Sequence, residues 1–131
     1  EKQIKVDAIL EVLGLQKCNS LMPSDLSGGM QKRAGLARAL ILEPEVILYD
    51  EPTAGLDPYN TRKIQEIITD LNLRGTGGIL VTHDIPTVLA SAHRMSLLKD
   101  GRIAVSGTVE DLKHNSLVQS FIEGDISYGK A

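Results

Sequence analysis

The sequence is poor in the residues that mark several common classes of protein. Of its 131 residues only 3% are aromatic and none is tryptophan, which disfavours a module that stacks nucleic-acid bases. The single cysteine, Cys18, has no partner for an internal disulfide, so we expect a reducing compartment. No apolar run approaches the ~20 residues needed to cross a bilayer. A net charge of −3 gives no general basic surface for nucleic acid.

The residues that are present fit one modest α/β domain. A hydrophobic content of 42% is enough for a buried core, and 131 residues lie within the usual size of a domain. The first residue is Glu1 rather than methionine, already in helix-like sequence, and we expect a fragment of a longer protein. Apolar spacing predicts amphipathic helices over residues 1–13 and 61–73, and Gly14 is the expected C-terminal cap of the first.

The chain is organised around residues 46–57, where an apolar run ends in two adjacent acids. Val46–Tyr49 is predicted to be a buried strand that delivers Asp50 and Glu51 at its C-terminal edge, where open α/β sheets bind ligands. Asp50 suits a Mg²⁺ site because hard cations take oxygen ligands. Glu51 suits the orientation of a water that attacks phosphorus. The alternative is a strand that merely ends in two solvated acids.

A second short strand is predicted over residues 79–81, followed directly by Thr82-His83-Asp84. Two strands joined by a helix are typical of a parallel βαβ unit, whose strand ends meet at one edge. That placement favours a functional His83, although a lone histidine at a strand end is more often structural. His93 and His114 lack such a setting, and we interpret both as surface residues.

Ser27-Gly28-Gly29 joins a turn-rich segment to a helix rich in alanine and leucine. Exposed backbone N–H groups and the dipole at such a helix start favour an anion, and the Ser27 hydroxyl adds a donor. In isolation the same residues are more often an ordinary serine N-cap with glycines that ease the turn. Lys32, Arg33 and Arg38 on the following helix could form no more than a solvated face.

The last third of the chain is predicted to hold a helix, a hairpin and a terminal helix. Pro86 fits the first turn of a helix, and Asp100-Gly101 is a dipeptide favoured in tight hairpins. Thr108 resembles an N-cap followed by an acidic third position, and residues 112–122 are expected to form a short terminal helix. The polar residues 124–131 are expected to be frayed.

Together these segments resemble the ATPase subunit of an ABC transporter. Four motifs match that family in order, along nearly the whole chain. Leu26–Met30 is similar to the signature motif, and Val46–Asp50 is similar to the Walker B strand, with Glu51 at the catalytic glutamate position. Ala54–Asp57 resembles the D-loop, and Thr82–Asp84 resembles the switch-histidine segment.

The resemblance implies an α/β fold of the P-loop NTPase-like ABC ATPase type, incomplete and divided into three parts. Residues 1–42 would form part of the helical signature subdomain with the signature helix. Residues 43–107 would form the ATPase core, and residues 108–131 a C-terminal helix and tail. No G-x-x-x-x-G-K-[ST] run occurs in the 131 residues, so the sequence lacks the Walker A half. We expect the fragment alone to bind ATP poorly and to hydrolyse none.

The same resemblance implies the cofactors and the roles of the site residues. ATP and Mg²⁺ are the expected cofactors, and two ATPase subunits would enclose two ATP molecules between them. Asp50 would hold Mg²⁺ through water, Glu51 would orient the attacking water, and His83 would contact the γ-phosphate. The resemblance places four residues at the bound nucleotide, where the two subunits meet. They are Ser27, Gly28, Gly29 and Asp57.

The expected partners are a second copy of the subunit and a transmembrane permease, with no nucleic acid. Met30–Arg33, Tyr49–Asp57 and the ending Phe121–Asp125 are similar to the Mla-type branch, which moves phospholipids with MCE-type substrate-binding proteins. The implied location is the cytoplasmic face of the inner or plasma membrane, reached through the permease.

Two other interpretations stay open. An ABC ATPase that works without a permease, in DNA repair or translation, usually carries large insertions or tandem copies, and neither is visible here. A stand-alone half that binds partners without catalysis would carry the same motifs.

Overall fold

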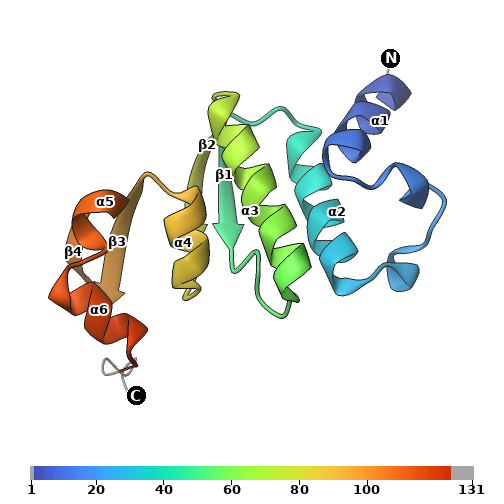
Figure 1. The fold of residues 1–131 in the computed structure, drawn as a ribbon. Coiled ribbons are helices and arrows are strands. Elements are labelled where there is room, and N and C mark those ends of the chain that lie inside the picture. Colours follow the sequence, from blue (N-terminus) through green and yellow to red (C-terminus); the bar gives the residue numbers. More distant parts are fainter. Residues whose placement is uncertain (1, 125–131) are drawn as a thin grey trace. The chain divides into compact units, whose positions relative to one another are not determined.

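The computed structural model describes residues 2–124 (Figure 1). The chain divides into two compact units with the boundary after His83. The elements of the first unit are α1 (Lys2–Val12), α2 (Gly28–Leu40), β1 (Val46–Asp50), α3 (Pro58–Leu73) and β2 (Gly77–Val81). Those of the second unit are α4 (Ile85–Ser91), β3 (Arg94–Lys99), β4 (Arg102–Thr108), α5 (Val109–Leu112) and α6 (Ser116–Ile122).

The first unit contains the βαβ arrangement that the sequence predicts. Strands β1 and β2 pair in parallel, with Val46 opposite Gly77 and Asp50 opposite Val81. Helix α3 provides the crossover that a parallel pair requires. Both strands therefore end at the same edge of the sheet.

One face of this sheet packs against α3. The apolar stripe of the helix is buried as its spacing predicts, and its members are Ile64, Ile67, Ile68 and Leu71. Ile47 and Tyr49 of β1 join the same core. Gly78 in β2 makes room for the Tyr49 ring, since a Cβ at residue 78 would lie 3.0 Å from Tyr49 Cε2.

The opposite face of the sheet is exposed, so the prediction of buried strands is wrong for the side chains that point to that face. The outward apolar residues are Val46, Leu48, Ile79 and Val81, with exposed fractions of 55%, 76%, 59% and 61%. The reason is that, within the described residues, the helices of this unit cover one face only.

Helices α1 and α2 complete the core of the first unit. The chain leaves α1 through Gly14, whose φ of +65° is the left-handed cap that the sequence predicts. Leu13 and Leu15, each 2% exposed, then pack with Leu36 of α2. The turn-rich connection contains two short 3₁₀ turns, Gln16–Cys18 and Pro23–Asp25.

The second unit contains the predicted hairpin, in which β3 and β4 pair antiparallel around Asp100 and Gly101, both with positive φ. Thr108 caps α5 by accepting the N–H of Asp111 at 3.1 Å. The single terminal helix predicted over residues 112–122 is wrong, because the side chain of Asn115 caps a new helix, α6, by accepting the N–H of Leu117.

Two further expectations concern the surface and the end of the chain. His93 and His114 are exposed, as predicted. The sequence predicts a frayed tail over residues 124–131, of which 125–131 lie outside the described residues.

Replacing Ile64 by alanine should lower the free energy of unfolding by about 2–5 kcal/mol, because it leaves a cavity in the core of the first unit. Ile64 is 2% exposed, whereas Leu73 on the same helix is 79% exposed. The matched Leu73→Ala variant should lose less than about 0.5 kcal/mol. Urea unfolding measures both, and equal losses would contradict the orientation of α3.

Candidate functional site

Glu51 directly follows β1 in a backbone conformation that is unusual for any residue other than glycine. Its φ is +44°, in the left-handed region, which costs an L-residue about 1–2 kcal/mol. Two contacts hold the backbone there. The N–H of Glu51 donates to the Val81 carbonyl at 2.9 Å, and Lys32 Nζ donates to the Glu51 carbonyl at 3.1 Å. Strand β2 and helix α2 therefore both fix the turn, and such held strain is characteristic of functional sites.

The Glu51 carboxylate accepts hydrogen bonds from the segment that follows β2. Oε2 accepts from Thr82 Oγ1 at 3.0 Å, and Oε1 accepts from the His83 N–H at 3.1 Å. His83 Nδ1 lies 2.7 Å from the same Oε1, so it must carry a proton when Glu51 is ionised. The hydrogen bond with the His83 side chain is the largest of the causes that lower the pKa of Glu51.

The carboxylate can still act as an acceptor. An ionised carboxylate offers about four lone-pair positions, and the contacts with Thr82 and His83 use three of them. A lowered pKa keeps Glu51 ionised near neutral pH. The group is therefore able to accept one more hydrogen bond, such as that of a water.

Asp50 ends β1 beside Glu51, and its side chain is exposed at the same edge of the sheet. No group of three or more histidine, cysteine, aspartate or glutamate side chains within residues 2–124 could hold a metal ion by itself. Mg²⁺ keeps several waters and usually binds through one or two carboxylates together with substrate phosphates. A lone Asp50 carboxylate fits that manner of binding.

Ser27 is the N-cap of α2, and its Oγ accepts the N–H of Met30 at 3.3 Å. The ordinary N-cap interpretation is thus correct for its oxygen, while the hydroxyl proton can still be donated. The first N–H groups of a helix have no intrahelical acceptor, so those of Gly28 and Gly29 belong to this helix start. Gly28 is exposed and Gly29 is buried.

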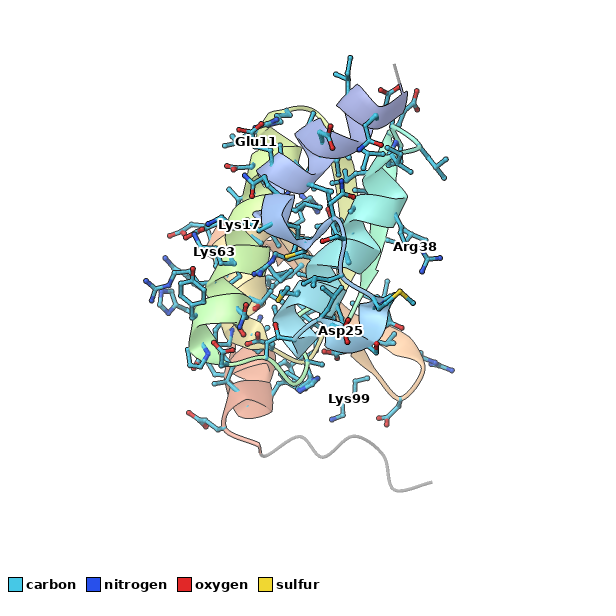
Figure 2. The ribbon with its side chains drawn as sticks, turned by 90° about the vertical axis from the view of Figure 1, so that its right-hand side faces the viewer. Glu11, Lys17, Asp25, Arg38, Lys63 and Lys99 are labelled. Carbon is cyan, nitrogen blue, oxygen red and sulfur yellow. The ribbon has the colours of Figure 1, made fainter. Side chains whose placement is uncertain are left out.

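The three cations of α2 do not form one solvated face. Arg38 is exposed and points outward from its helix (Figure 2). Lys32 reaches the Glu51 carbonyl, and Arg33 Nη1 donates to Asn60 Oδ1 at 3.1 Å. Sequence reasoning missed both contacts because their partners lie 19 and 27 residues away.

Asp57 caps helix α3. Its Oδ1 accepts the N–H groups of Tyr59 and Asn60 at 3.0 and 3.1 Å, and Pro58 occupies the first helical turn. Hydrogen bonds lower the pKa of Asp57, with the one from the Asn60 side chain as the largest cause. The Asp57 carboxylate therefore caps the helix that follows it, a role that was not expected from the sequence.

Comparison with known proteins identifies the family of this chain. The family described as ABC transporter matches residues 1–54. The intermembrane phospholipid transport system ATP-binding protein MlaF of Escherichia coli (strain K12) is 42% identical over 118 residues, which are 88% of this chain and 44% of that protein. The chain belongs to the ABC transporter ATP-binding family. It spans less than half the length of this relative.

Other members of the ABC family agree in sequence and fold. The methionine import ATP-binding protein MetN of Campylobacter jejuni is 39% identical over 127 residues, covering 93% of this chain and 38% of that protein. The ADP conformation of an ATP-binding cassette of an ABC transporter superposes with a TM-score of 0.83 at 26% identity, over 94% of this chain and 50% of that one. The expected ABC ATPase fold is confirmed for about half of a cassette.

Replacing His83 by alanine should raise the pKa of Glu51 toward its ordinary value of 4.5, because the largest cause of the lowering is removed. Thr82→Val removes one weaker contact and should raise the pKa less. Carboxyl-carbon NMR titration of Glu51 measures both changes. A pKa that stays the same in both variants would contradict the hydrogen bonds at this edge.

The same shift predicts how stability depends on pH. The pKa of Glu51 is lower in the folded chain than in the unfolded chain. Its contribution to stability is therefore complete above the ordinary pKa and is lost as the pH falls through the lowered one. Urea unfolding between neutral pH and pH values below 4.5 should show this loss in the original chain and a smaller one in His83→Ala.

Proposed function

We propose that these residues belong to the ATP-hydrolysing subunit of an ABC transporter. The observation that carries the proposal is the meeting of Asp50, Glu51 and His83 at one edge of a parallel sheet, in a chain of this family. Ligands of open α/β sheets bind beyond the carboxyl ends of the strands. A metal-binding carboxylate, an ionised acceptor and an imidazole suit phosphoryl transfer, which relies on positioning and electrostatic stabilisation.

The contacts of each residue support a distinct role at this edge. Bound Mg-ATP would supply the γ-phosphoryl group and a cation that offsets the charge of the phosphate oxygens. Asp50 would hold the Mg²⁺ through water. Glu51 would accept a hydrogen bond from a water and orient it for attack. His83 would contact the γ-phosphate and stabilise the charge that develops there.

The start of α2 would serve a nucleotide held mainly by a second subunit. The helix dipole and first-turn N–H groups favour a phosphate, and Gly28 leaves them open to solvent. Ser27 would add its hydroxyl proton, since its oxygen already accepts from Met30. Gly29 would contribute its backbone, and Asp57 would lie at the interface of the two subunits.

The proposal includes three functional segments along the chain. Residues 1–42 would belong to the helical signature subdomain, with the signature helix at its end. Residues 43–107 would form the ATPase core, with the Walker B strand, the D-loop and His83. Residues 108–131 would form the C-terminal segment, in which two short helices, α5 and α6, replace the single helix expected from the sequence.

The proposed partners are a second ATPase subunit and a transmembrane permease, at the cytoplasmic face of the membrane. Residues 2–124 include no helix with the length and apolar character to cross a bilayer. Phospholipid as the substrate, and an MCE-type binding protein as a partner, are supported by the similarity to the phospholipid-transport protein MlaF. The name of the second relative, which imports methionine, supports only the broader assignment to transport.

The test is ATP hydrolysis in an assembly that supplies a Walker A segment, either a longer polypeptide containing these residues or a second polypeptide added to this chain. Glu51→Gln keeps the size of the side chain and removes its charge, so turnover should fall by about 10²–10⁴-fold. The 131 residues alone should bind Mg-ATP weakly and hydrolyse none, because they contain no Walker A sequence.

Glu110→Gln is the matched control for the removal of one carboxylate. Glu110 lies in the second unit, is largely exposed and pairs with Lys113 on the same turn. Such a surface pair contributes little, so turnover should stay close to that of the original protein. Equal turnover in the Glu51→Gln variant, or no hydrolysis with all parts present, would contradict the proposed function.

A further inference from the structure

Asn60, in the first turn of α3, contacts two motifs of the first unit through one amide group. Its Oδ1 accepts from Arg33 Nη1 at 3.1 Å, and Arg33 lies four residues beyond Gly29 on the signature helix α2. Its Nδ2 donates to Asp57 Oδ2, at the end of the D-loop segment 54–57. The two ends of the Asn60 amide therefore connect the signature helix to the D-loop within one chain.

The same side chain fills the space beside Gly29. A Cβ at Gly29 would lie 2.4 Å from both Cγ and Oδ1 of Asn60, and 3.0 Å from its Cβ. Real Cβ atoms do not approach other atoms so closely. A Cβ at Gly28 would meet nothing within 4 Å. Of two adjacent glycines, only the second is therefore required by the packing of this chain.

The side-chain amide of Asn60 is not needed to cap α3. Asp57 Oδ1 accepts the backbone N–H groups of Tyr59 and Asn60, and any non-proline residue at position 60 provides the same N–H. The amide instead partners Arg33, whose Nε is buried without a hydrogen-bond partner among residues 2–124. Loss of the amide would therefore leave Arg33 less satisfied while the helix cap remained.

We propose that Asn60 is a positioning residue that fastens the signature turn to the Asp57 carboxylate, and that glycine is required at position 29 because Asn60 occupies the space of a Cβ. The functional consequence rests on the proposed function, in which Ser27–Gly29 face the nucleotide and Asp57 lies at the interface of the two subunits. Fastened in this way, the two segments keep a fixed separation within one subunit.

The first experiment enlarges the side chain at position 29, alone and together with removal of the side chain at position 60. Thermal unfolding of the full chain without nucleotide measures the effect. Gly29→Ala should lower the melting temperature by roughly 5 °C or more, because overpacking displaces Asn60 and breaks its bond with Arg33. Gly28→Ala is the matched control one residue away and should leave the melting temperature nearly unchanged. In an Asn60→Gly background, which removes the whole side chain, Gly29→Ala should be tolerated as well as Gly28→Ala.

The second experiment measures the pKa of Asp57, in a variant that introduces no steric clash. Asn60→Ala keeps the backbone N–H groups and removes the amide, so the pKa of Asp57 in an NMR titration should rise toward its ordinary value. A purely structural loss of packing at position 60 would not move this pKa. Arg62→Ala, a change two residues along the same helix, is the control and should leave it in place.

The outcomes separate this inference from the proposed function, because neither experiment involves ATP. An equal effect of Gly28→Ala and Gly29→Ala, a failure of Asn60→Gly to rescue Gly29→Ala, or an unmoved pKa of Asp57 in Asn60→Ala would each overturn the role of Asn60. A failure of ATP hydrolysis in the complete assembly would overturn the proposed function and leave the role of Asn60 standing.

Discussion

The left-handed backbone of Glu51, at the end of β1, is the constraint on which the rest of the site depends. A strand that continued in extended conformation would place successive side chains on opposite faces of the sheet. With φ at +44°, the chain turns instead, and the Glu51 carboxylate meets Thr82 and His83 beyond the neighbouring strand. The unfavourable backbone conformation is offset by hydrogen bonds to both its main chain and its side chain.

The partners of Glu51 in those hydrogen bonds lie on separate elements of the fold. The parallel register of β1 and β2 sets the Val81 carbonyl opposite the Glu51 N–H, and α2 brings Lys32 to the Glu51 carbonyl. Helix α2 thus also supports the turn that holds Glu51, the proposed catalytic residue. A second link, through Asn60, joins this helix to Asp57. Two separate sets of hydrogen bonds, one to Glu51 and one through Asn60 to Asp57, therefore start from the same helix.

Patterns of short range in the sequence predict much of this unit correctly. The stripe of α3, the left-handed Gly14 and the parallel pairing of two apolar runs follow from spacing and turn chemistry that are local to each segment. The ABC family, and with it the candidate site residues, follows from the order of the motifs. For those features no knowledge of distant contacts is needed.

The remaining features depend on contacts between distant residues, and the sequence does not encode them locally. Lys32 resembles any solvated lysine of a helix until the turn at Glu51 is placed near it. Nothing near Asn60 indicates that it fills the space beside Gly29. The exposed face of β1 and β2 was also missed, because an apolar run alone does not tell how many of its faces are covered. The split of the terminal helix depends on one capping side chain, that of Asn115.

The most direct test of the central constraint compares Glu51→Gly with Glu51→Ala by urea unfolding. Both variants lose the carboxylate contacts, so their difference reports the backbone alone. Because glycine adopts a left-handed conformation without penalty, Glu51→Gly should be more stable than Glu51→Ala by about 1 kcal/mol. If Glu51→Ala is instead equally stable or more stable, as expected for an extended residue, the backbone is not left-handed and the account of the site is wrong.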